Sequence, residues 1–88
     1  MIEGTTSSGF TFQLNENVLD NMELVDLLAE GREDAIAVSK IARLILDDAQ
    51  RQRLYEHHRG DDGRVPYSAV QADIAEMFLA FQQPGKNS

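Results

Sequence analysis

The chain has 88 residues, no cysteine and a formal net charge of −7, which limits it to one small acidic domain. Neither a disulfide nor a thiolate metal site can stabilise such a chain, so association with another copy or partner is an open source of stability. An acidic surface repels phosphate backbones, and we therefore expect no nucleic-acid partner. No apolar run reaches membrane-spanning length and the start does not resemble a signal peptide, so we expect no membrane association and a cytoplasmic location.

The negative charge is concentrated in the first part of the chain. Residues 1–34 hold eight acidic side chains and a single basic one, Arg32. This asymmetry has two interpretations: it keeps the protein soluble, or it steers a basic partner toward this half.

The N-terminal region predicts a flexible segment followed by a strand. Residues 1–9 are small and polar, which is typical of a flexible N-terminus. Residues 10–14 then alternate apolar and polar, with Phe10 and Phe12 on the apolar side. A lone strand leaves its backbone groups unpaired, so it needs a partner. Two candidates are the residues around Val65 and the same strand of another subunit. Phe10 and Phe12 are therefore candidate partner-binding residues in a possible homo-oligomer.

A first helix is predicted from about Val18 to Glu30, with Asn17 as its N-cap. At 100° per residue, one face of this helix is apolar and consists of Val18, Met22, Val25 and Ala29. Leu24 and Leu27 do not belong to that face, because they lie on or beside the acidic side. Either the helix is covered on two sides, by the last helix and the strand, or Leu24 and Leu27 form a partner-binding surface.

Two further helices follow closely. The second is predicted from Asp34 or Ala35 to about Leu46, with a buried face made of Val38, Ile41, Ala42 and Ile45. The third begins after a cap at Asp47 or Asp48, ends near His58, and has Leu54 and Tyr55 as its main apolar residues.

The last helix has the strongest apolar pattern. Pro66 suits its first position, and a continuous stripe follows that consists of Tyr67, Val70, Ile74, Met77, Phe78 and Phe81. Residues 83–88 are predicted to be a flexible tail. The sequence thus predicts a mainly α fold, a compact bundle of about four helices with one short N-terminal strand, in a single domain over residues 10–82.

The loop at 59–66 resembles part of a calcium-binding EF-hand loop. In that register Asp62 takes position 5 and Gly63 the sharp turn at position 6. Three positions that should carry carboxylates hold instead His58, Gly60 and Ala69. We therefore expect an EF-hand-like loop that lacks metal ligands.

No residue pattern predicts catalysis, a cofactor or a metal. His57 and His58 are adjacent, so on a helix their side chains point about 100° apart, and no cysteine or third histidine completes a site. The aspartate pairs at 47–48 and 61–62 are better explained as helix caps and turn residues than as catalytic carboxylates. No serine lies in a nucleophile-elbow context. We therefore expect a protein that is not an enzyme.

Two blocks resemble a known family: residues 10–30 (FTFQLNENVLDNMELVDLLAE) and residues 54–70 (LYEHHRGDDGRVPYSAV). They are similar to the small tail assembly chaperones of long-tailed, siphovirus-type phages and prophages of Gram-positive bacteria. The motifs are structural: the strand, the Leu-Tyr helix and the Asp-Gly-Arg-Val-Pro hinge. The resemblance implies a protein without catalytic residues that coats the aggregation-prone tape measure protein until the tail tube polymerises around it.

A second interpretation belongs to another functional class. The helix pair around the EF-hand-like loop is also typical of a small regulatory or adaptor domain that grips one target helix. Stoichiometry separates the two, because a coat binds in many copies along one chain and an adaptor binds one to one.

Overall fold

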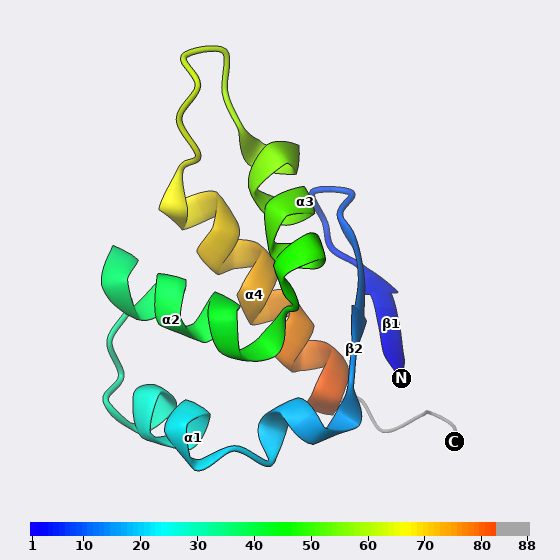
Figure 1. Ribbon diagram of the computed structural model, residues 1–88, viewed down its shortest axis with the longest axis vertical. Coiled ribbons are helices and arrows are strands. Elements are labelled where there is room, and N and C mark those ends of the chain that lie inside the picture. Colours follow the sequence, from blue (N-terminus) through cyan, green and yellow to red (C-terminus); the bar gives the residue numbers. More distant parts are fainter. Residues whose placement is uncertain (83–88) are drawn as a thin grey trace.

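The computed structural model describes residues 1–82 and has four α-helices and a two-stranded antiparallel sheet at the N-terminus (Figure 1). In chain order the elements are β1 (Ile2–Thr5), β2 (Thr11–Leu14), the 3-10 helix η1 (Glu16–Leu19), α1 (Met22–Ala29), α2 (Ala35–Ile45), α3 (Asp48–His58) and α4 (Tyr67–Gln82). This confirms the predicted small helical bundle. The predicted tail at 83–88 lies outside the described residues.

The N-terminal segment forms a strand where a flexible end was expected. β1 pairs with β2 in antiparallel register, with Ile2 opposite Leu14 and Gly4 opposite Phe12. Within this chain the partner of β2 is therefore β1 and not the Val65 region. A Cβ at position 4 would lie 2.8 Å from Phe12 Cζ, so any larger residue there would displace the buried Phe12 ring. β1 has only one large apolar residue, so no alternation of apolar and polar residues reveals this strand in the sequence.

The predicted helix at 18–30 is divided into η1 and α1. Asn15 caps η1, and the side chain of Asn21 caps α1 by accepting a 3.0 Å hydrogen bond from the Glu23 N–H. Asp20 and Asn21 leave helical geometry between the two elements, because Asn21 has an extended backbone at φ −147°. Two capping asparagines in succession favour two short helices over one long helix.

The predicted bounds of α2 and α3 are confirmed. Asp34 and Asp47 each cap their helix by accepting a backbone N–H, from Ala37 and Gln50 respectively. The face of α2 that was predicted to be buried is buried, as is Leu54 of α3.

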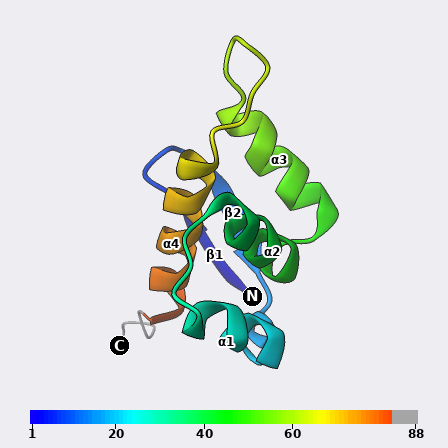
Figure 2. The ribbon, with the colours of Figure 1, turned by 90° about the vertical axis from the view of Figure 1, so that its left-hand side faces the viewer.

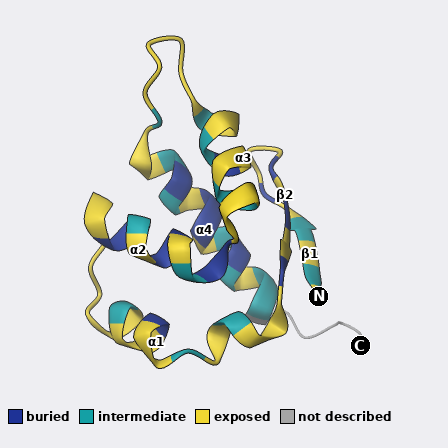
Figure 3. Ribbon diagram, in the orientation of Figure 1, coloured by how far each residue is buried: buried dark blue, intermediate teal, exposed yellow. Residues whose placement is uncertain are grey.

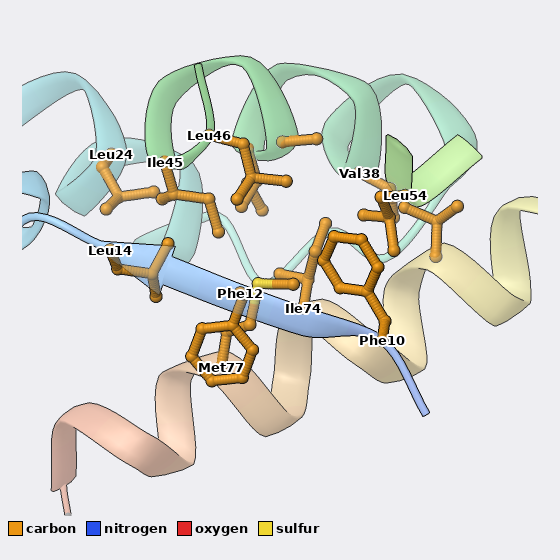
Figure 4. Packing of buried hydrophobic residues seen from close by; sticks show 13 residues of the cluster. Phe10, Phe12, Leu14, Leu24, Val38, Ile45, Leu46, Leu54, Ile74 and Met77 are labelled. Atoms are coloured by element: carbon orange, nitrogen blue, oxygen red, sulfur yellow. The ribbon is translucent and has the colours of Figure 1, made fainter. Parts of the chain in front are cut away.

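The core lies where β2 and all four helices converge (Figure 4). α4 supplies Val70, Ile74 and Met77 to it and packs against α2, α3 and β1. The two ends of its predicted stripe are less buried: Phe78 and Phe81 are half-buried, and Tyr67 is exposed.

The molecule is elongated, with principal extents of 43 × 28 × 20 Å. The loop at 59–66 projects from one end and α1 closes the other, as both side views show (Figures 1 and 2). Within the described part of the chain, no helix combines the length and apolar character needed to cross a membrane.

Candidate partner-binding site

Of the four residues predicted to bind a partner, three are core residues. Phe10, Phe12 and Leu24 are buried, and Leu24 is only 1% exposed (Figure 4). Leu27 is half-buried and packs against the same core. Leu24 and Leu27 therefore do not form an exposed apolar patch. They face the core because the break before Met22 reorients α1, whose main helical neighbour is α2 rather than α4.

The exposed apolar surface of α1 includes Met22 and Val25 of the predicted apolar face, together with Leu28. Met22, Val25 and Leu28 are 68%, 44% and 46% exposed. Much of the α1 ribbon carries the colour of exposed residues (Figure 3). We call these three residues the outer α1 face. At 100° per residue they occupy one side of the helix, opposite the Leu27 side. The sequence signal was present as an apolar stripe, but helical periodicity alone does not say which of two apolar sides is covered.

A groove of about 440 Å³ separates α1 from α2, and we call it the α1–α2 groove. Its apolar lining consists of Leu27 from α1 and Leu44 from α2. Its charged lining consists of Glu23, Asp26 and Glu30 from α1 and Lys40 and Arg43 from α2. Leu27 thus packs on the core and also lines a concave surface.

A buried carboxylate that sequence analysis missed lies on α4. Asp73 is 2% exposed and accepts hydrogen bonds from Ser8 Oγ, at 3.1 and 2.9 Å to its two oxygens. Its Oδ2 also lies 2.8 Å from His58 Nε2. Beside this cluster, Glu76 Oε1 accepts the Ser7 N–H at 2.8 Å. These contacts fasten the 6–9 turn of the hairpin to α3 and α4.

The cluster does not have the proton-transfer order of a hydrolase triad. His57 Nε2 lies 2.9 Å from the Ser8 carbonyl oxygen, which can only accept, so Nε2 carries the proton. The same nitrogen is 3.3 Å from Ser8 Oγ and therefore cannot act as a base toward it. Ser8 Oγ instead directs its proton at the Asp73 carboxylate or at Thr6 Oγ1, which is 2.9 Å away. The arrangement is suited to holding the turn in place.

The 59–66 loop is closed by its own residues. The Gly60 N–H donates to the Arg64 carbonyl at 2.8 Å, and Gly63 turns the chain with φ +84°. The Arg64 backbone N–H and the Arg64 guanidinium both donate to the Asp62 carboxylate. Both hydrogen bonds lower the pKa of this carboxyl group, and the backbone N–H has the larger effect. Among residues 1–82, no group of three or more His, Asp or Glu side chains is arranged to hold a metal ion.

A smaller apolar cleft of about 200 Å³ lies between α2, α3 and the start of α4. Its apolar lining includes Val38, Tyr55, Val65, Tyr67 and Val70. This cleft lies at the base of the 59–66 loop.

Comparison of the chain with protein-family models, with curated proteins and with solved structures finds no match.

Proposed function

We propose that this protein is a non-enzymatic tail assembly chaperone of a phage or prophage, which binds and solubilises the tape measure protein before the tail tube polymerises. The observation that carries the proposal is the outer α1 face, Met22, Val25 and Leu28, which leaves apolar side chains in solvent on an acidic protein. The resemblance of residues 10–30 and 54–70 to that family gives the proposal its client.

The physical requirements of the role agree with this surface. A chaperone that coats a long helical client needs accessible apolar side chains to cover those of the client. It also needs strong net charge, so that the coated complex repels other complexes and stays in solution. The outer α1 face supplies the first, and the acidic residues concentrated in 1–34 supply the second.

The proposal is tested by co-expression with the tape measure protein of the same phage or prophage. We expect the wild-type protein to raise the soluble fraction of the client and to co-purify with it in many copies per client chain. Met22→Gln combined with Val25→Gln and Leu28→Gln should abolish both effects and leave the helical circular dichroism unchanged, because all three side chains are exposed.

A matched control removes exposed apolar side chains elsewhere. Ile36 on α2 and Leu79 on α4 are 61% and 53% exposed, so Ile36→Gln with Leu79→Gln lowers surface hydrophobicity without touching the outer α1 face. This control should behave as wild type. Equal loss in both variants would show that general hydrophobicity, not this face, holds the client. Retention of the client by the triple variant would contradict the proposed surface.

The second candidate function is a one-to-one adaptor, which the 200 Å³ cleft at the base of the 59–66 loop favours. That cleft is large enough to take an apolar anchor of a single target helix. Val70 is buried at its floor and Tyr67 is exposed at its rim. A complex with one copy per client, lost on Tyr67→Asp and retained in the triple Gln variant, would favour the adaptor.

A further inference from the structure

The α1–α2 groove combines two features of a helix-binding site. Leu27 and Leu44 give it an apolar lining, and both side chains are half-buried against the core, so their positions are fixed by packing. α1 and α2 form its two sides. Each wall is a helix whose backbone is already hydrogen-bonded, so the groove offers no strand edge to an extended peptide. A helix is the form of partner that fits such walls.

The two walls carry opposite charge. Glu23, Asp26 and Glu30 recur on α1 at a spacing that spans about two helical turns, roughly 10 Å. Lys40 and Arg43 occupy the α2 side. Across the described part of the chain, none of these acids forms an ion pair with Lys40 or Arg43. Of the five charged residues, Glu30 is the only one in an ion pair, with Arg32 at 3.4 Å. The groove therefore presents two rows of opposite charge that form no direct ion pair with each other.

We propose that the α1–α2 groove binds an amphipathic helix of split charge, with an apolar stripe between one basic edge and one acidic edge. The stripe covers Leu27 and Leu44, the basic edge faces the α1 wall, and the acidic edge faces the α2 wall. Because reversing the partner would place like charges together, the walls also fix its direction. This surface is separate from the outer α1 face and does not depend on the tape measure protein being the client.

Three synthetic helical peptides test the proposal. They share one length and one apolar stripe, and their edges are Lys and Glu, Lys on both sides, or Glu on both sides. By titration calorimetry at low salt, the wild-type protein should bind the split peptide roughly tenfold more tightly than either of the others. The difference should shrink as salt screens the wall charges.

A charge-swapped groove should change that order. Lys40→Glu with Arg43→Glu makes both walls acidic, so the peptide with two Lys edges should become the tightest ligand. Arg59→Glu with Arg64→Glu makes the same change in net charge on the distant 59–66 loop and should keep the wild-type order. Since Lys40 and Arg43 are exposed, the swap leaves the fold intact.

Four results would overturn the inference. The first is that the wild type binds the two-Lys peptide most tightly, which would mean that the overall charge of −7, and not the groove, determines the affinity. The second is an unchanged order after the charge swap. The third is no binding of any peptide up to about 1 mM. The fourth is a change of oligomeric state in the swapped variant without peptide, which would assign the groove to a second copy of this chain.

Discussion

Replacing Asp73 should detach the N-terminal hairpin from the helices and destabilise the protein. In the wild type this carboxylate accepts from Ser8 Oγ and lies 2.8 Å from His58 Nε2, at a site where Asp73 itself is 2% exposed. Asp73→Ala leaves the largely buried His58 nitrogen without its partner, a loss of about 1.5–3 kcal/mol for a hydrogen bond to a charged group. The loss at Ser8 is smaller, about 0.5–1 kcal/mol, because Ser8 is exposed and water replaces the carboxylate.

These contributions add to about 2–4 kcal/mol, from which relief of the carboxylate's own desolvation subtracts. Stability of a small domain is about 5–15 kcal/mol, so the variant should remain folded but unfold at visibly lower urea concentration. Asp73→Asn keeps the shape and one acceptor oxygen, and we expect an intermediate loss. Ser8→Ala serves as the matched control for the exposed half of the cluster.

Urea denaturation followed by circular dichroism measures the change, and amide hydrogen exchange locates it. The Phe10 N–H donates to Thr6 Oγ1 at 3.2 Å inside the fastened turn, so its exchange should accelerate in Asp73→Ala more than that of helix amides. A shift in the free energy of unfolding below about 0.5 kcal/mol, or no change in exchange at the turn, would refute the fastening role.

Three further predictions follow from burial, backbone geometry and charge. Leu24→Ala should lower the free energy of unfolding by about 2–5 kcal/mol, because Leu24 is buried. Met22→Ala should change the same quantity by no more than about 0.5 kcal/mol in the same urea melt, because Met22 is exposed. The reverse ranking would contradict the orientation of α1. Gly63→Ala should cost about 1–2 kcal/mol because φ is +84° there, although no atom lies within 4 Å of the added Cβ; an unchanged melt would deny that strain. The lowered folded-state pKa of Asp62 contributes stability that is present above the unfolded pKa and is lost as pH falls through the folded pKa. In Arg64→Gln a carboxyl NMR titration should find the pKa raised but still below its usual range, since the backbone N–H, the larger cause, remains.

Elements whose signals are local were predictable from the sequence. Asp34 and Asp47 mark the starts of α2 and α3, because their side chains cap these helices. The apolar spacing of Val70, Ile74 and Met77 identifies the buried face of α4. In each case a few neighbouring residues determine the outcome, so no tertiary information is needed.

The rest depended on contacts between distant segments. β1 is a strand because β2 and α4 lie beside it, which no pattern within residues 1–9 reveals. α1 has apolar residues on two sides, and its packing against α2 decides that Leu24 is buried and Met22 is not. Asp73 lies inside an apolar pattern, where its role depends on Ser8, 65 residues away.

The contacts that fasten the hairpin to α4 can form only after α4 has been synthesised. Ser7 and its acceptor Glu76 are 69 residues apart, so the first strand leaves the ribosome long before the helix that holds it. Until α4 emerges, β1 lacks the helix on which it packs, and the turn at 6–9 lacks the carboxylates that hold it. Closing so long a loop is entropically unfavourable without those contacts. The nascent protein therefore completes its fold only after translation has passed Glu76, and a ribosome stalled before that codon would display an unfinished, apolar hairpin.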